Sequence, residues 1–200
     1  NAALYETGHA ELERASLQEM ERELGKRVLA SLITTVGGGN FAPRQDHLTR
    51  LHDALLAHET SRGRTLGGCR ILRRGDNILI ARESGRVRES NLREGERTVW
   101  DNRYEIHLRK PKSGNARACT IRALGETGWA TIPRDDLPPR AFLLPPAVRS
   151  ALPAIYVGHS LVAVPHLGFA RPAPKSASVL RANVRFIPAK PVSSVVFPVA

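Results

Sequence analysis

Arginine is the residue type whose spacing in this sequence points most directly to chemistry. Five arginines fall within nineteen residues, among short apolar stretches: Arg64, Arg70, Arg73, Arg74 and Arg82. A guanidinium stays charged and presents a planar fork of N–H donors that matches two phosphate oxygens. The pattern therefore predicts binding to a polyanion, and a solvated arginine-rich surface is the alternative that charge alone leaves open.

The basic charge lies in one part of this 200-residue chain, whose net charge is +11. Residues 1–62 hold 7 basic and 9 acidic residues and carry −2, whereas residues 63–200 hold 23 basic and 10 acidic residues and carry +13. Clustered cations displace the counterions condensed on a nucleic-acid backbone, so the second part is the candidate for polyanion binding. From this division of charge we expect two domains, a helical region over 1–62 and a basic β-rich region over 63–200.

Side chains of the types used in catalysis stand in unfavourable contexts. Asp135-Asp136 lie between prolines, where a turn or cap role is expected. Ser160 lacks the Gly-x-Ser-x-Gly elbow of a nucleophilic serine. Cys69 follows two glycines, but its strand context favours a small buried residue over an exposed thiolate. The sequence predicts no catalytic residue.

Two other patterns are weak signals for ligand binding. His47, His52 and His58 are spaced by five and six residues, so they do not share a helix face as paired metal ligands do. Gly37-Gly38-Gly39 is followed by neither Gly-Lys-Ser nor Gly-Lys-Thr, so it predicts a turn that ends a helix. We expect no metal ligand and no cofactor within this chain.

The elements that precede the arginines have a helical pattern. Apolar residues recur at near-helical spacing over 9–36, which predicts one long amphipathic helix that the triple glycine ends. A second helix starts after Pro43 and ends near His58. The two predict a helical hairpin.

From residue 65 the period changes to that of strands. Cys69–Arg73 and Ile78–Arg82 flank the turn-like 74–77 and predict a hairpin. Tyr104–Leu108 alternate in polarity and have Val99-Trp100 as a partner, while the polar interval 84–97 is expected to be a surface loop. Arg109 and Arg103 are weaker binding candidates than the hairpin arginines. Arg109 follows the alternation outward, whereas Arg103 lies in the turn.

The rest of the chain predicts more β structure. We expect a strand at 118–124, an irregular proline-rich segment at 133–146, a short helix from Pro145 and a hairpin of 154–157 with 161–164. The segments 184–187 and 195–197, among prolines, predict edge strands or docked extended chain. The predicted fold class is α+β, with an N-terminal helical hairpin followed by a mostly antiparallel β-rich part.

Few features bear on location. No apolar run approaches the roughly 20 residues that span a bilayer, and the cysteines, Cys69 and Cys119, show no CxxC spacing. We expect no membrane partner and a cytoplasmic location. The chain begins at Asn1 without an initiator Met, so we expect a fragment of a longer protein.

Several short motifs, in this order and spacing, are similar to those of one enzyme family. They are Thr65-Leu-Gly-Gly-Cys-Arg-Ile71, Arg82-Glu83, Val99-Trp-Asp-Asn-Arg-Tyr104, Leu143-Leu-Pro145, Arg149-Ser-Ala-Leu-Pro-Ala154 and Gly158-His-Ser-Leu-Val-Ala-Val-Pro-His-Leu-Gly168. This part of the chain resembles the C-terminal part of bacterial tRNA(Ile)-lysidine synthases. The preceding helices, with Phe41-Ala-Pro-Arg44, resemble the middle helical region of that family.

The resemblance implies a role in tRNA modification. Members of the family use ATP, with Mg as the expected metal, to attach lysine to the wobble cytidine of an isoleucine tRNA with a CAU anticodon. Their ATP site is an SGGxDS loop in an N-terminal catalytic domain, and this sequence has no such motif. The resemblance therefore implies a non-catalytic part that grips tRNA, with that tRNA and the N-terminal catalytic domain as partners, inactive on its own.

Two other readings stay open at this point. The chain could be a scaffold or a homodimerisation module without RNA contact, with Trp100 and Trp129 either at the interface or, as is commoner for tryptophan near strands, in the core. It could also be a complete small enzyme that uses Cys69.

Overall fold

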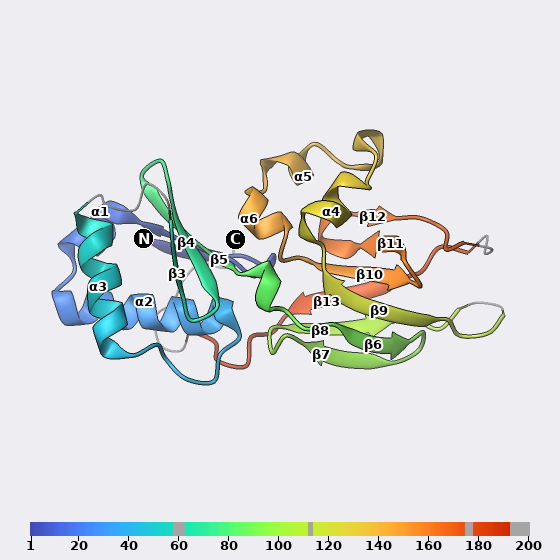
Figure 1. Ribbon diagram of the computed structural model, residues 1–200, viewed down its shortest axis with the longest axis horizontal. Helices are drawn as coiled ribbons and strands as arrows, with labels where there is room; N and C mark the ends of the chain where they lie inside the picture. Colours follow the sequence, from blue (N-terminus) through green and yellow to red (C-terminus); the bar gives the residue numbers. More distant parts are fainter. Residues whose placement is uncertain (58–62, 112–113, 175–177, 193–200) are drawn as a thin grey trace. The chain divides into compact units, whose positions relative to one another are not determined.

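The computed structural model describes residues 1–57, 63–111, 114–174 and 178–192. The chain folds into two compact units, which are residues 1–83 with 187–200 and residues 84–186. Helices and three antiparallel sheets make up the described part of the chain (Figure 1). The predicted α+β class is confirmed.

The first unit contains a five-stranded antiparallel sheet. Its strands are β1 (Ala2–Leu4), β2 (Ala10–Glu13), β3 (Arg64–Leu66), β4 (Cys69–Arg74) and β5 (Asn77–Arg82), in the order β1-β2-β5-β4-β3. Because β3, β4 and β5 join β2 in one sheet, the first compact unit extends past residue 62, the expected domain boundary. The hairpin predicted around residues 74–77 is confirmed as β4 and β5.

The single helix predicted over residues 9–36 is wrong. Residues 10–13 form β2, and two helices follow, α1 (Arg14–Glu19) and α2 (Arg22–Gly37). Ala10 and Leu12 are fully buried while Glu11 and Glu13 are partly exposed, which is the two-residue period of a strand. The helical run breaks at Met20 and Glu21, both with extended backbone, and the Glu21 carboxylate caps α2 by accepting from the amides of residues 23 and 24.

The triple glycine ends α2 as predicted. Gly38 has a φ of 65°, in the left-handed region, and its amide donates to the carbonyl of Thr34. The second predicted helix is α3 (Gln45–Leu56), which packs against α2 as an early helical hairpin. His58, its expected end, lies outside the described residues.

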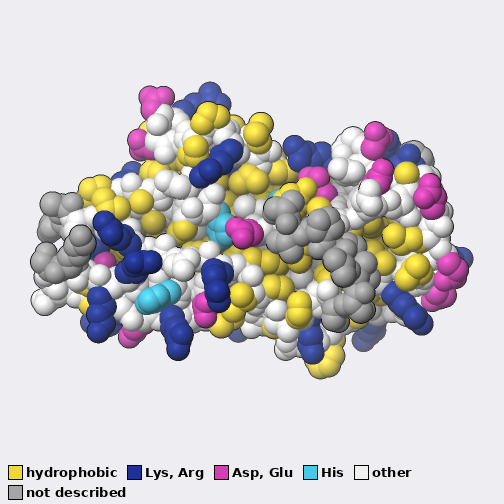
Figure 2. Space-filling view, turned by 180° about the vertical axis from the view of Figure 1, so that it is seen from behind, with side chains coloured by type: hydrophobic (Ala, Val, Ile, Leu, Met, Phe, Trp, Pro, Cys, Tyr) yellow, Lys and Arg dark blue, Asp and Glu magenta, His cyan; other side chains and the backbone are white. Residues whose placement is uncertain are grey.

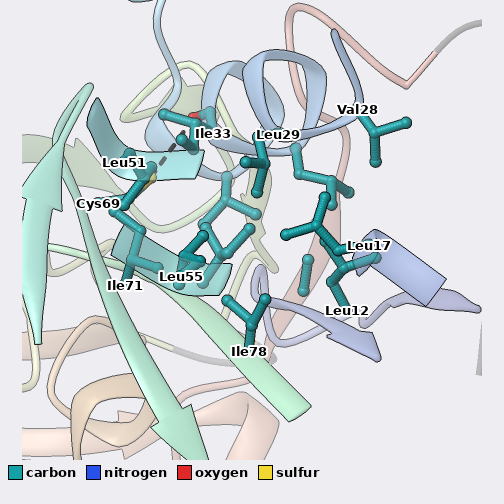
Figure 3. Close-up of a cluster of buried hydrophobic side chains, with 14 of the residues drawn as sticks. Leu12, Leu17, Val28, Leu29, Ile33, Leu51, Leu55, Cys69, Ile71 and Ile78 are labelled. Carbon is teal, nitrogen blue, oxygen red and sulfur yellow. Dashed lines mark hydrogen bonds between the residues drawn. The ribbon is translucent and has the colours of Figure 1, made fainter. Parts of the chain in front are cut away.

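Helices and sheet of the first unit share one apolar core, shown in Figure 3. The labelled side chains point toward one another from β2, the three helices and the β4–β5 hairpin: Leu12, Leu17, Val28, Leu29, Ile33, Leu51, Leu55, Cys69, Ile71 and Ile78. The Cys69 thiol donates to the Ile33 carbonyl at 3.4 Å. This core fixes β4, the strand that carries the candidates Arg70, Arg73 and Arg74.

The second unit has two antiparallel sheets. The five-stranded sheet has the order β12-β11-β10-β9-β6, with β6 (Ser90–Arg93), β9 (Ala118–Ala123), β10 (Pro153–Val157), β11 (Ser160–Val164) and β12 (Phe169–Ala170). The three-stranded sheet has the order β13-β8-β7, with β7 (Arg97–Trp100), β8 (Tyr104–Leu108) and β13 (Ala182–Phe186). Buried residues of both sheets, such as Ile106 and Ile121, belong to one core cluster. The sheets therefore pack as two layers.

Short helices accompany a second core cluster of this unit. They are α4 (Gly125–Ala130), α5 (Arg140–Leu143) and α6 (Pro146–Arg149), with 3-10 turns η1 (Ser84–Arg86), η2 (Arg134–Asp136) and η3 (Pro165–Leu167). The cluster joins Leu124, Ile132 and Ala141 to Tyr156 of β10. Ile155, the neighbour of Tyr156, belongs to the core between the sheets, so β10 is buried on both faces.

Most predicted strands of this unit are confirmed, and one prediction is wrong. The paired strands β7–β8 and β10–β11 and the strand at 118–123 are present. The interval 84–97, expected to be a surface loop, contains β6, because Leu92 is buried against the core and the segment pairs with β9. The expected strand at 195–197 lies outside the described residues.

Candidate nucleic-acid interface

The exposure of each arginine in the β4–β5 hairpin depends on its position along the strand. Cys69 and Ile71 point into the core, and Arg70, between them, is exposed on the other face. The two-residue loop after Arg74 turns at Gly75, whose φ is 60°. Arg73 and Arg74 therefore lie exposed at the tip of the hairpin.

Both arginines at the tip already have partners within the protein. Arg74 forms an ion pair with Glu11 at 3.1 Å, and Glu11 also accepts from Asn77 at 3.4 Å. Nε of Arg73 donates to the Gly75 carbonyl at 3.1 Å. A phosphate at this tip would have to compete with Glu11 for one of the two guanidinium groups.

Arg82 takes a structural position at the other end of the hairpin. Its side chain is buried, and Nη1 donates to the Gly68 carbonyl at 2.9 Å. Gly68 has a φ of 76°, and a Cβ there would collide with the same guanidinium. Arg82 therefore holds the β3–β4 turn, and its side chain presents little surface to a ligand.

Arg64 lies on β3, beside an open cavity of about 490 Å³ in the first unit. The described residues that line the cavity are His47, Arg50, Leu51, Gly63, Arg64, Thr65 and Leu66. Arg50 is paired with Asp46 at 2.8 Å, and His47 is 3.6 Å from the same carboxylate. Arg64 itself is exposed.

Arg109 belongs to the second unit, so it is not part of the hairpin group. It follows β8 and lines a pocket of about 310 Å³ with Glu94, Lys110, Pro111, Arg117, Ser178, Val179 and Arg181. Its amide donates to the carbonyl of Arg181 at 2.9 Å, which continues the β8–β13 ladder by one residue pair. Four cationic side chains and one carboxylate therefore line this pocket.

Glu94 and Arg117 form the most completely bonded ion pair of the pocket. The Glu94 carboxylate accepts from the amide, Nε and Nη2 of Arg117 at 2.9, 2.9 and 2.6 Å. These hydrogen bonds lower the pKa of Glu94 and raise that of Arg117. The only carboxylate among the described lining residues is thus occupied by one arginine.

Arg103, the weaker candidate, is a core residue. Its side chain is fully buried, and Nε donates to Asp101 at 2.7 Å. Asp101 and Asn102 have φ values of 53° and 54° in the tight turn before β8. Arg103 therefore supports that turn.

The charge is divided unequally between the units. Residues 84–186 hold 17 basic and 8 acidic residues and carry +9, whereas residues 1–83 with 187–200 hold 13 and 11 and carry +2. Figure 2 shows one face of the molecule, where Lys and Arg side chains are spread widely with acidic ones between them. Most of the positive charge accordingly belongs to the two-sheet unit rather than to the arginine hairpin.

Curated proteins of one kind match this chain over much of its length. A tRNA(Ile)-lysidine synthase of Ruegeria pomeroyi is 31% identical over 165 residues, which cover 82% of this chain and 36% of that protein. The enzyme of Wolbachia pipientis wMel is 30% identical over 131 residues, covering 64% and 27%. The chain is a relative of the tRNA(Ile)-lysidine synthases.

A third tRNA(Ile)-lysidine synthase, from Rickettsia rickettsii, is 26% identical over 171 residues, covering 83% of this chain and 35% of the enzyme. The chain thus spans between about a quarter and a third of the length of these curated relatives. No protein-family model matches the sequence, and no solved structure matches it.

In this relative of the tRNA(Ile)-lysidine synthases, the residues considered for catalysis lie in the core, in a strand or in a turn. Cys69 is fully buried in the core of the first unit. Ser160 begins β11 after a turn, and Asp135 and Asp136 form η2. Burial raises the pKa of the Cys119 thiol to about 11, so it is protonated at neutral pH. None of these geometries prepares a nucleophile.

The tryptophans considered for an interface differ in burial. Trp100 is 2% exposed and its indole N–H donates to the Arg88 carbonyl at 2.9 Å, so it is a core residue. Trp129 is partly exposed, with the Arg149 guanidinium 4.1 Å from its ring centroid. An interface role for Trp100 is therefore wrong, because the core already covers it.

Two of the remaining histidines are buried within the first unit. His9 stacks on Tyr5 with ring centroids 4.4 Å apart, and burial lowers its pKa to about 4. Nδ1 of His52 lies 3.3 Å from Asp53. Among the described residues, no group of three His, Cys, Asp or Glu side chains is arranged to hold a metal ion.

No described helix is long and apolar enough to cross a membrane.

Sequence reasoning identified Arg109 but missed the residues that surround it. Lys110 is its neighbour, while Arg117 and Arg181 come from other segments of the chain. Only the pairing of β8 with β13 brings Arg181 opposite Arg109. Charge counts show such residues as basic, but they do not show which of them meet.

Proposed function

We propose that this chain is the tRNA-binding, substrate-positioning part of a tRNA(Ile)-lysidine synthase. In this proposal it holds an isoleucine tRNA with a CAU anticodon while an N-terminal catalytic domain adds lysine to the wobble cytidine, with ATP and Mg bound there. We propose the cytoplasm as its location. The observation that carries the proposal is the charge of +9 on residues 84–186 in a chain whose relatives are named for a tRNA reaction.

The charge pattern suits recognition of a folded RNA. Contacts from exposed Arg and Lys side chains go mainly to phosphate and 2′-hydroxyl groups, so they read the shape of a tRNA more than its bases. The exposed candidates are Arg64, Arg70, Arg73, Arg74 and Arg109. Arg82 is better suited to supporting the hairpin that carries three of them.

Salt dependence tests the proposal against the scaffold alternative. Each phosphate contact adds about 0.7 to 0.9 to the slope of log affinity against log salt concentration. We expect the chain to bind isoleucine tRNA with a slope that corresponds to several contacts. A chain that binds no tRNA even at low salt would instead be a scaffold or a dimerisation module.

The hairpin tip is tested by replacing Arg73 and Arg74 together with alanine. Loss of the cationic contacts at the tip should weaken tRNA binding by at least about tenfold at low salt, because even one hydrogen bond to a charged group contributes about 1.5 kcal/mol or more. The matched control replaces Arg27 and Arg44, which are exposed on the helical side of the same unit. If both double variants bind tRNA equally well, the tip is not part of the interface.

A gain-of-function assay addresses the reaction itself. Joining this chain to a catalytic domain of a tRNA(Ile)-lysidine synthase should increase lysine incorporation into tRNA relative to the catalytic domain alone. We expect the KM for tRNA to fall and kcat to stay unchanged, because the chain supplies binding and no reacting group. An unchanged KM would contradict a role in positioning the substrate.

A further inference from the structure

The outer face of the β8–β13 ladder contains an unfavourable cross-strand pair. Because Ala182 is opposite Leu108, the next pair of the antiparallel register places Arg181 opposite Arg109, and the hydrogen bond between their backbones confirms it. Both side chains are exposed. Like charges directly opposite each other in a sheet destabilise it.

At the other end of the same face, the cross-strand pair has opposite charges. Arg185 is opposite Glu105, and their side chains form an ion pair at 2.9 Å. Both pairs flank Asn183 and His107, so one short ladder holds an attractive pair and a repulsive pair. The exception at Arg109 and Arg181 is therefore local.

Neighbouring residues add further positive charge to that exception. Lys110 lines the same pocket, and its aliphatic stem lies over Gly95, where a Cβ would be 2.8 Å from Cγ of Lys110. Gly95 has a φ of 97°, which few other residues adopt. Both the backbone conformation and the lysine stem therefore favour glycine at residue 95.

The one acidic residue among the described lining residues does not neutralise the group. Glu94 directs its carboxylate to Arg117, which is held further by donation from Nη1 to the Ser178 carbonyl at 3.0 Å. With Arg117 counted, the described lining residues carry four positive charges and one negative charge. A fixed guanidinium next to three more cations is a prepared environment for an anion.

We propose that the pocket formed by Arg109, Lys110, Arg117 and Arg181 is a binding site for a phosphate group. Its volume of about 310 Å³ admits a phosphate, and the bound anion would relieve the repulsion between Arg109 and Arg181. The group that it receives is a backbone phosphate of RNA, and this part of the inference rests on the proposed function. Inorganic phosphate shares the chemistry and serves as the probe of the site.

The first measurement is a titration of the whole chain with inorganic phosphate, followed by backbone amide NMR. We expect saturable shifts at residues 109–110, 117 and 178–181 at constant ionic strength. The double variant Arg109→Ala with Arg181→Ala should lose these shifts. The matched control, Arg88→Ala with Arg97→Ala, removes two exposed arginines of the same unit outside the pocket and should keep them.

The second measurement is the binding of isoleucine tRNA by the same proteins across a salt series. One lost phosphate contact lowers the slope of log affinity against log salt by about 0.7 to 0.9. We expect that decrease, and about a tenfold weaker affinity at low salt, in the pocket variant and not in the control. Thermal unfolding of the pocket variant should be unchanged or shifted upward, which separates lost binding from lost folding.

The outcomes distinguish the site from the function. If phosphate shifts no pocket residue, or the pocket and control variants respond alike, the site is wrong even where tRNA still binds. If phosphate binds at the pocket but the tRNA slope of the pocket variant is unchanged, an RNA phosphate is not its ligand. If phosphate binds but no variant or wild-type chain binds tRNA, the proposed function fails while the anion site stands.

Discussion

The arginines of the β4–β5 hairpin and those of the pocket beside β8 differ in what surrounds them. At the hairpin, Arg74 is paired with Glu11 and Arg82 is bonded to the Gly68 carbonyl. In the pocket, Arg109 is opposite Arg181, and the nearby carboxylate is bonded to Arg117. Four arginines lie in the hairpin, yet the arrangement that a bound anion would stabilise is in the pocket.

The comparison suggests two uses of one residue type. A buried guanidinium that is bonded within the protein, as Arg82 is, contributes to stability, and its removal should be measured as unfolding. A guanidinium that is opposite another cation costs stability, and its removal should be measured as lost binding.

Removing the carboxylate of the pocket should destabilise the second unit most. Glu94 is buried and accepts three hydrogen bonds from Arg117, so Glu94→Ala removes the carboxylate that balances the charge of that guanidinium. We expect a loss of about 3 kcal/mol in the free energy of unfolding at pH 7, at the lower end of values for broken buried pairs. Urea unfolding measures it, with Glu89→Ala, at an exposed acid of the same unit, as the control.

The same ion pair gives stability a defined pH dependence. The hydrogen bonds from Arg117 lower the folded-state pKa of Glu94 below its ordinary value of 4.5. Its contribution is therefore complete above that value and is lost as pH falls through the lower, folded pKa. The difference in stability between wild type and Glu94→Gln should shrink as the pH falls below 4.5, and a constant difference would contradict the assignment.

At the hairpin, Arg82→Ala should reduce stability without a specific effect on RNA binding. The variant loses a hydrogen bond from a charged donor to the Gly68 carbonyl, for which about 2 kcal/mol is expected. Arg70→Ala, an exposed residue of the neighbouring strand, should leave the free energy of unfolding within about 0.5 kcal/mol of wild type. Urea unfolding measures both changes. If the Arg82→Ala protein is as stable as wild type but binds tRNA more weakly, Arg82 contacts RNA and the structural assignment is wrong.

The strands of the hairpin were predictable because their signals are local. Cys69 and Ile71 alternate with polar residues, and Gly75 lies in the loop between two apolar runs. The early strand β2 was missed because Leu12 and Leu17 also fit a helical repeat, and the periodicity alone could not separate the two. Pairing with β5, residues 77–82, decides the matter, and that contact is distant in sequence.

The candidate site was less predictable for a related reason. Arg64, Arg70, Arg73 and Arg74 were predicted because they flank a hairpin that the sequence indicates, and Arg109 was predicted from the alternation of β8. Arg82 has the same local pattern, but its side chain is buried against Gly68, where a Cβ would collide with the guanidinium. Arg181 lies 72 positions after Arg109 in the sequence, so no local pattern could show that the two are opposite each other.

The smallest predicted changes compare two charge reversals on β13 and the residue before it. Arg181→Glu places an acid opposite Arg109 and should raise the free energy of unfolding by about 0.5 kcal/mol, because a repulsive cross-strand pair becomes attractive. Arg185→Glu places an acid opposite Glu105 and should lower it by about the same amount. Urea unfolding in about 10 mM salt measures both changes, and both should diminish at about 1 M salt, where screening is strong. If Arg181→Glu instead destabilises the protein as Arg185→Glu does, then Arg181 makes a favourable contact within the folded chain, and the pocket does not hold the unrelieved repulsion that the anion site requires.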